Sequence, residues 1–319
     1  MQAIRDRLEN SQIALYFAAV ALGLLAALLV PATTVLEAAI NPALAVMLFV
    51  TFLQVPLNEL GRAFTHTRFL GALLTTNFVV IPLLVACLLP LVPNEPLVRF
   101  GVLLVLLAPC IDYVVTFSHL GRADARLLLA ATPVLLCVQV LLLPFYMSVL
   151  LGGAAAALIQ PQPFIEAFLF LIVAPLGFAA ALQYRATSSA GAARALTVLG
   201  LVPVPATALV LFVVVAAVVP QLGQARDAAR GVVPVYALFA LLAPLAGWLV
   251  ARLFKLAAPA GRAVAFSGAT RNSLVVLPLA LSVPGALPLL PAIIVTQTLV
   301  ELLAELVYVR ASRSLDART

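Results

Sequence analysis

Four charged residues lie inside long apolar runs of this sequence: Asp112, Arg271, Glu301 and Glu305. A charged side chain in the middle of a hydrophobic layer costs at least about 2.5–3.5 kcal/mol on insertion scales. Residues that bear this cost usually pair with one another or take part in binding a substrate, an ion or a proton. The positions of these four residues therefore mark the candidate site.

Asp112 follows an interruption in its apolar run, the segment APCIDYVV at residues 108–115. Pro109 lacks a backbone N–H and clashes with the carbonyl one turn earlier, so a helix should kink or unwind there. The thiol of Cys110 and the hydroxyl of Thr116 lie nearby, and a thiol is a soft ligand for a metal or metalloid. We expect Cys110, Asp112 and Thr116 to bind substrate. The alternative for Cys110 is ordinary apolar packing.

A second interruption, ATRNSLVV at residues 269–276, contains Arg271. Freed carbonyls and the ends of half-helices often bind solutes and ions within a membrane. We expect the two interruptions to cross, with Asp112 and Arg271 lining or pairing across a shared site. Asn272 and Ser273 are then further substrate-binding residues. The alternative is a structural ion pair that does not contact substrate.

The last apolar run carries three polar residues at a spacing of four, Gln297, Glu301 and Glu305. This spacing places all three on one face of a helix. Glu301 lies near the middle of the run and is a candidate proton carrier, as is Asp112. Glu305 lies near the end of the run, where we expect its carboxylate to snorkel to the membrane surface. Asn77, in the third run, is expected only to hydrogen-bond between helices.

The composition requires that these residues belong to a membrane protein. The chain has 319 residues, of which 65% are hydrophobic and 9% are charged, against about 25% charged residues in an average soluble domain. The predicted class is therefore an all-α integral membrane protein in a lipid bilayer. A net charge of +6 fits loops that face anionic lipid and does not indicate nucleic acid. The sequence contains no HExxH, paired-aspartate or nucleophile–histidine pattern, so an intramembrane enzyme is a remote alternative and no cofactor is expected.

Apolar stretches of about 20 residues are long enough to cross a bilayer. Ten such spans are predicted, at residues 12–30, 36–55, 69–92, 97–120, 127–151, 164–184, 197–220, 232–254, 264–283 and 287–309. With both termini in the cytoplasm, fourteen Lys and Arg residues fall in cytoplasmic segments and three in the loops on the other side. This asymmetry follows the positive-inside rule. We therefore expect a multi-pass protein of the inner, or cytoplasmic, membrane.

The chain is also predicted to repeat itself upside down. Residues 1–155 would form a first five-helix repeat and residues 156–319 a second, inverted one, and the two would make one intertwined membrane domain. Because each half has an odd number of spans, the second half enters the membrane from the opposite side. The interrupted spans, helices 4 and 9, fall at matching places in the two halves. Interrupted helices in inverted repeats are typical of the midplane binding site of a secondary transporter.

These motifs resemble the bile acid/sodium symporter superfamily, which includes the arsenite-efflux permeases. The strongest local matches, within a likeness that covers nearly the whole chain, are APCIDYVVTFSHLG, FSGATRNSLVVLPLAL and TQTLVELLAEL. The resemblance implies a panel domain of helices 1, 2, 6 and 7 and a core domain of the other six. It also implies that Cys110 and Glu301 match the cysteine and glutamate tied to the transport of trivalent arsenic. Where sodium-coupled members ligate sodium, this chain has Ser267, Arg271 and Asn272, and a guanidinium has no acceptor atom for sodium.

Two substrates follow from these residues. The first is arsenite or a related trivalent arsenical, exported with Cys110 as the arsenic ligand and with Glu301 or Asp112 as the proton carrier. The second is an organic anion whose carboxylate pairs with Arg271. In both cases Arg271 favours proton coupling or facilitated flux over sodium coupling. The expected partners are thus a small solute or metalloid oxyanion and the lipid bilayer, and a homo-oligomer is left open.

Overall fold

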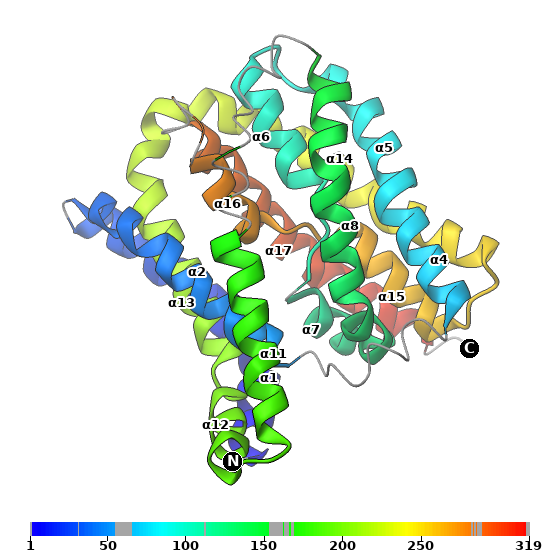
Figure 1. Ribbon diagram of the computed structural model, residues 1–319. Coiled ribbons are helices and arrows are strands. Elements are labelled where there is room, and N and C mark those ends of the chain that lie inside the picture. The colour runs from blue at the N-terminus through cyan, green and yellow to red at the C-terminus, as the bar shows by residue number, and fades with distance from the viewer. Residues whose placement is uncertain are drawn as a thin grey trace. The chain divides into compact units, whose positions relative to one another are not determined.

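The computed structural model describes residues 2–30, 32–54, 66–111, 113–152, 162, 166, 169–281, 283, 285 and 289–316. Within these ranges the elements are helical and none is a strand (Figure 1). The elements of the first half are α1 (Gln2–Leu29), η1 (Thr33–Leu36), α2 (Glu37–Phe52), α4 (Thr67–Thr75), η3 (Thr76–Val80), α5 (Ile81–Leu88), η4 (Leu89–Leu91), α6 (Pro96–Leu106), α7 (Tyr113–Leu120) and α8 (Ala125–Leu151). Those of the second half are η5 (Leu169–Val173), α11 (Ala174–Ala186), α12 (Ala190–Leu199), α13 (Pro203–Val218), η6 (Val219–Gln221), α14 (Leu222–Leu253), α15 (Ala258–Ala269), α16 (Ser273–Leu281) and α17 (Leu289–Asp316).

Six described helical stretches are long and apolar enough to cross a membrane. They are Ser11–Leu29, Thr33–Phe52, Thr67–Leu91, Ala125–Leu151, Ala225–Leu253 and Leu289–Ser314. A seventh span results if α12 and α13, which meet at a bend of 47°, are counted together. These seven overlap seven of the ten predicted spans, so the chain is a multi-pass helical membrane protein. Ten spans in two inverted repeats stay a prediction.

The other three predicted spans are interrupted or only partly described. The span predicted at residues 97–120 consists of α6 and α7, and that at 264–283 consists of α15 and α16. Each half of such a span is shorter than the roughly 20 residues that a crossing needs. Both predicted interruptions, in the spans at residues 97–120 and 264–283, are therefore present in the structure. The third span, predicted at residues 164–184, lies partly outside the described residues.

The chain forms two compact units. Unit 1 comprises residues 1–57, 160–225 and 277–288, and it holds the segments predicted as helices 1, 2, 6 and 7. In this unit α13 packs against α1 and α2, and α11 packs against α2. These are the helices that the resemblance assigns to a panel domain, but the unit also contains residues 277–281 of predicted helix 9, which the resemblance assigns to the core domain. The division into repeats at residues 1–155 and 156–319 stays a prediction.

Unit 2 comprises residues 58–159, 226–276 and 289–319. Its most buried helix is α6, eight of whose eleven residues are buried, as expected of a helix whose residues are apolar except for Arg99. In this unit α6 packs against α8 and α17, and α15 packs against α4, α7 and α8 (Figure 1). The two interruptions and the polar face of α17 thus belong to the same compact unit.

Prolines in the helices of unit 2 leave carbonyls without their usual helical donor, because proline has no N–H. For Pro82, Pro133 and Pro244, the carbonyl four residues earlier accepts a side-chain hydroxyl instead. The pairs are Phe78 O with Tyr146 Oη at 2.5 Å, Leu129 O with Thr132 Oγ1, and Ala240 O with Tyr308 Oη. Because lipid offers no hydrogen-bond donor, these hydroxyls allow the helices to contain proline inside a membrane.

Candidate functional site

The two interrupted helices of unit 2 are joined to each other at their breaks. An antiparallel bridge pairs Pro109 with Arg271. Since Pro109 has no N–H, the hydrogen bonds come from the flanking amides. They run from Cys110 N to Thr270 O at 3.2 Å and from Asn272 N to Ala108 O at 2.8 Å. Backbone groups that the breaks expose are thereby satisfied by each other, as a water-free interior requires.

The carboxylate of Glu301 lies against this crossing and accepts three hydrogen bonds. Oε1 accepts from Tyr113 Oη at 2.5 Å, and Oε2 accepts from Arg271 N at 2.7 Å and from Gln297 Nε2 at 2.5 Å. Tyr113 begins α7, Arg271 lies in the second break, and Gln297 precedes Glu301 by one turn of α17. With 3% of its surface exposed, Glu301 holds both interrupted helices to α17.

A single peptide group connects Glu301 to Cys110. The carbonyl of the Thr270–Arg271 peptide accepts from Cys110 N, and the N–H of the same peptide donates to Glu301. The side chain of Cys110 is fully buried. Because a peptide group is a rigid plane, a change in the charge of Glu301 reaches the backbone that carries the thiol through one rigid unit.

The guanidinium of Arg271 is held by carbonyl and amide oxygens. Nη2 donates to Ser267 O at 2.5 Å, to Gly268 O at 2.7 Å and to Asn77 Oδ1 at 2.9 Å, and Nη1 donates to Leu106 O at 3.4 Å. Ser267 and Gly268 lie in the last turn of α15, and Leu106 ends α6. The positive charge is therefore placed at the C-terminal ends of two helices, which carry the negative ends of their dipoles.

Asn77 reaches this cluster from η3, a π-helical turn. Its Nδ2 donates to Ser267 Oγ at 2.9 Å and to Leu73 O at 3.1 Å. The close approach of η3 to α15 requires Gly268, because a Cβ there would lie 2.9 Å from Thr76 Cγ2. Single π-turns occur frequently at functional sites. Asn77 is thus a member of the site, and its type and its position in an apolar run do not distinguish it from an ordinary interhelical hydrogen-bonding residue.

Glu305, one turn further along α17, has fewer partners. Its Oε1 accepts from Thr270 Oγ1 at 2.5 Å, and the same hydroxyl lies 2.7 Å from Phe266 O. Glu305 Oε2 has no hydrogen-bond partner among the described residues. The side chain is 0% exposed, so the prediction that Glu305 snorkels to the surface is wrong. The reason is that α17 continues to Asp316, well beyond the predicted end of the span.

Asn272 and Ser273 are both buried at the start of α16. Asn272 Oδ1 accepts from Val275 N at 3.3 Å, as a cap of that helix, while its Nδ2 has no partner in the described part of the chain. Ser273 Oγ accepts from Thr298 Oγ1 of α17 at 2.8 Å. Their substrate-binding role stays a prediction.

Of the predicted site residues, Cys110, Arg271 and Glu301 meet at the crossing. Thr116 is half-buried on α7. Asp112 lies outside the described residues, so its pairing with Arg271 and its role as a proton carrier stay predictions. Tyr113 adds a polar atom beside the first break in the sequence, but its contact with Glu301 was not predicted, because no local pattern indicates that its hydroxyl reaches that residue.

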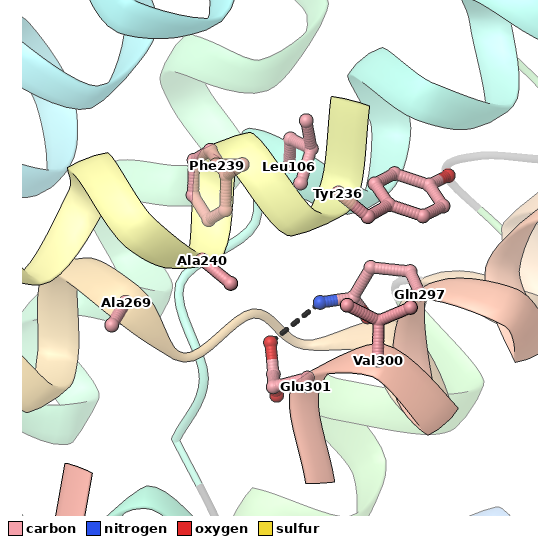
Figure 2. Close-up of a pocket in the computed structure, with 8 residues that line it drawn as sticks. All are labelled: Leu106, Tyr236, Phe239, Ala240, Ala269, Gln297, Val300 and Glu301. Atoms are coloured by element: carbon pink, nitrogen blue, oxygen red, sulfur yellow. Dashed lines mark hydrogen bonds between the residues drawn. The ribbon is translucent and has the colours of Figure 1, made fainter. Parts of the chain in front are cut away.

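A cavity of about 10 Å³ lies beside Glu301. It is lined by residues of α6, α14, α15 and α17: Leu106, Tyr236, Phe239, Ala240, Ala269, Gln297, Val300 and Glu301 (Figure 2). Figure 2 shows Gln297 and Glu301 joined by their hydrogen bond at one wall. A cavity needs about 10–15 Å³ to hold one water molecule. The carboxyl group of Glu301 therefore borders a space close to the size of a single water.

The chemistry available at the crossing is that of one thiol, two carboxyl groups and one fixed cation. In the part of the chain that the structure describes, no group of three His, Cys, Asp or Glu side chains is placed to hold a metal ion. The thiol and the carboxyl groups are the side chains there that can exchange a proton.

A comparison with protein families gives a match. Residues 41–225, more than half of the chain, match a family model described as the Sodium Bile acid symporter family. The match includes the first break, and the second break lies beyond it. No curated protein matches the chain. The family and the apolar helices together indicate a membrane transporter with a small-molecule substrate.

Proposed function

The chain belongs to the sodium bile acid symporter family, and from this we propose that it is a proton-coupled exporter of arsenite or a related trivalent arsenical in the cytoplasmic membrane, with both termini in the cytoplasm. The observation that carries the proposal is the Thr270–Arg271 peptide, which connects the backbone of Cys110 to the carboxylate of Glu301. The residue that would bind cargo and the residue that would bind the proton are thus linked through one rigid group.

Cys110 supports the choice of substrate. Trivalent arsenic is a soft, thiol-seeking centre, and soft thiolate ligands select such centres over hard ones. The hydroxide of trivalent arsenic is uncharged at neutral pH, so it needs no counter-charge in the site. A single thiolate at the buried crossing would hold it weakly and reversibly, which suits a carrier that must release its cargo.

Arg271 supports proton coupling over sodium coupling. In many transporters, unwound carbonyls and the C-terminal ends of half-helices bind the coupling cation. Here the guanidinium of Arg271 donates to those carbonyls, at the ends of α6 and α15. A guanidinium stays protonated and has no acceptor atom, so it would repel a sodium ion. Among the described residues, Glu301 is then our candidate for taking up and releasing the coupling proton, and Asp112 stays the other candidate from the sequence.

An organic anion is the second candidate substrate. The description of the family favours it, and so does Arg271 Nε, a buried donor without a hydrogen-bond partner among the described residues. A carboxylate on Arg271 would have to compete with Ser267 O, Gly268 O and Asn77 Oδ1, which already accept from Nη2. The arsenite proposal needs no such exchange and is therefore preferred.

Arsenite resistance of an exporter-deficient bacterium tests the substrate. We expect the chain to confer resistance, Cys110→Ser to abolish it at normal membrane levels, and Arg271→Lys to retain part of it. Cys137→Ser is the matched control, because Cys137 is an exposed thiol on α8. Full resistance in a well-expressed Cys110→Ser strain would refute the arsenite proposal. Loss in Arg271→Lys with a silent Cys110→Ser would favour the organic anion.

Replacement of sodium in proteoliposomes tests the coupling ion. We expect transport to be unchanged when sodium is replaced by potassium or choline, and to follow an imposed proton gradient. A loss of most transport on sodium replacement would contradict the interpretation of Arg271 as a built-in cation.

A further inference from the structure

The hydroxyl of Tyr113 lies between two acceptors. Its Oη is 2.5 Å from Glu301 Oε1 and 3.2 Å from the carbonyl oxygen of Arg271. A tyrosine hydroxyl has one proton to donate and can also accept. Its proton can therefore point to Glu301 or to the carbonyl of Arg271 in the second break, depending on whether Glu301 is ionised or protonated.

With Glu301 ionised, both carboxylate oxygens accept hydrogen bonds. Tyr113 donates to Oε1, while Arg271 N and Gln297 Nε2 donate to Oε2. Hydrogen bonds to an ionised acceptor are the stronger class. Three donors from three places in the chain thus hold the charged form.

With Glu301 protonated on Oε1, the same groups are again satisfied. The acid O–H donates to Tyr113 Oη, the Tyr113 proton turns to Arg271 O, and Oε2 becomes a carbonyl oxygen that keeps its two donors. One proton is gained and no bond between heavy atoms changes. A buried donor or acceptor without a partner costs about 1–3 kcal/mol, and in both states the two oxygens of Glu301 and the hydroxyl of Tyr113 keep a partner.

We propose that Tyr113 is a positioning residue for proton coupling, whose hydroxyl changes from donor to acceptor when Glu301 is protonated and passes the change to the carbonyl of Arg271. The role assigned to Tyr113 rests on the proton coupling proposed above. Protonation of Glu301 thereby adds a hydrogen bond between α7 and the second break, which belong to the two different interrupted helices.

Other titratable groups surround Glu301 and Arg271. They are Tyr236 of α14, Cys110 of the first break, and Glu305 and Tyr308 of α17, and Asp112 lies outside the described residues. Among the described residues, Tyr113 is the titratable side chain that is hydrogen-bonded to Glu301. The switch is therefore assigned to Tyr113, and the other groups set its electrostatic background.

Infrared difference spectroscopy of the purified protein in lipid tests this role without a known substrate. The ring C–O stretch of tyrosine differs between a hydroxyl that only donates and one that both donates and accepts. We expect a tyrosine C–O band that changes with pH together with the carboxyl band of Glu301. The tyrosine change should be absent in Tyr113→Phe and in Glu301→Gln.

Tyr146→Phe is the matched control for this experiment. It also removes a hydroxyl that donates to a backbone carbonyl, at Phe78, at 2.5 Å, and it should keep the pH-dependent tyrosine band. A Glu301 carboxyl band that titrates without a change at Tyr113 would overturn the proposed switch alone. If the Glu301 band does not change with pH at all, the proposal of proton coupling through Glu301 is refuted, and the proposed change at Tyr113 is refuted with it.

Transport by proteoliposomes loaded with arsenite gives a second test of the role of Tyr113. We expect Tyr113→Phe to lower proton-driven efflux about tenfold, equivalent to about 1.4 kcal/mol, the net worth of one hydrogen bond. Exchange of arsenite without a proton gradient should change much less. Equal losses in the two assays would indicate a merely structural role for Tyr113.

Discussion

Glu301 and Glu305 lie one turn apart on the same face of α17, and both are buried. Both oxygens of Glu301 accept hydrogen bonds, including one from a backbone N–H. Glu305 has one hydroxyl partner, Thr270, and its second oxygen has none among the described residues. The environment of Glu301 can hold a charge, whereas Glu305, with a single hydroxyl donor, suits a neutral acid.

The comparison teaches that burial does not distinguish the two carboxyl groups, while the donors around them do. An ionised carboxylate buried without partners is far more costly than a neutral acid. Glu301 has three donors and, through Tyr113, a partner in both protonation states, whereas Glu305 has one hydroxyl partner and an oxygen without any among the described residues. We therefore expect Glu301 to exchange the coupling proton and Glu305 to keep its own.

The largest difference is expected between Glu301→Gln and Glu305→Gln. Glutamine resembles a protonated carboxyl group in shape, so both variants should fold and reach the membrane. Glu301→Gln should lose nearly all proton-driven transport, because its side chain cannot release a proton. Glu305→Gln should keep most of it, because the neutral form is its working state.

Proton-driven efflux from proteoliposomes of matched protein content measures this difference. Equal losses in the two glutamine variants would break the distinction between the two carboxyl groups. A fully active Glu301→Gln variant would remove Glu301 from the coupling mechanism.

A smaller effect is expected on stability when Arg271 is removed. Arg271→Ala leaves buried oxygens without a donor, at about 1–3 kcal/mol for each orphaned group, although the backbone N–H bond to Glu301 can remain. The loss of the nearby positive charge should penalise Glu301 more than Glu305. Adding Glu301→Gln to Arg271→Ala should therefore recover part of the stability, and adding Glu305→Gln should recover little.

Denaturation midpoints of the single and double variants in one detergent give the interaction energies, since residues in one network are not additive. Strict additivity for Arg271 with Glu301 would show that the charge of Arg271 does not act on that carboxyl group.

The smallest effect is expected from Thr270→Val. This change removes the hydroxyl between Glu305 and Phe266 O and keeps the shape of the side chain. We expect a loss of about 1–3 kcal/mol in the free energy of unfolding, because one buried group, Glu305, loses its partner, with transport nearly unchanged. A strong loss of transport at normal stability would indicate that Glu305 also handles the coupling proton.

The sequence predicted the features that depend on local chemistry. Pro109 breaks the fourth span because proline cannot donate, and the structure has the break at that place. The spacing of Gln297, Glu301 and Glu305 predicted a shared face, and Gln297 does bond to Glu301. The spacing of polar residues along a helix and the missing N–H of a proline have their effects within one or two helical turns. Such effects can be predicted without knowledge of the tertiary structure.

Features that depend on distant segments could not be predicted in the same way. Tyr113 reaches Glu301 and Asn77 reaches Arg271 across most of the chain, and no pattern around either residue indicates its partner. The depth of Glu305 was predicted wrongly because the polar residues after Val309 were taken as the end of the span, while α17 continues to Asp316.

The bridge between the two breaks also has a consequence for how the chain is made. Ala108 O and Cys110 N are paired with Asn272 and Thr270, which are synthesised long after the first break has entered the membrane. Until then these backbone groups need water or another protein as a partner, because lipid offers none. Chains whose synthesis stops before residue 272 should therefore be held by membrane chaperones and degraded by quality-control proteases.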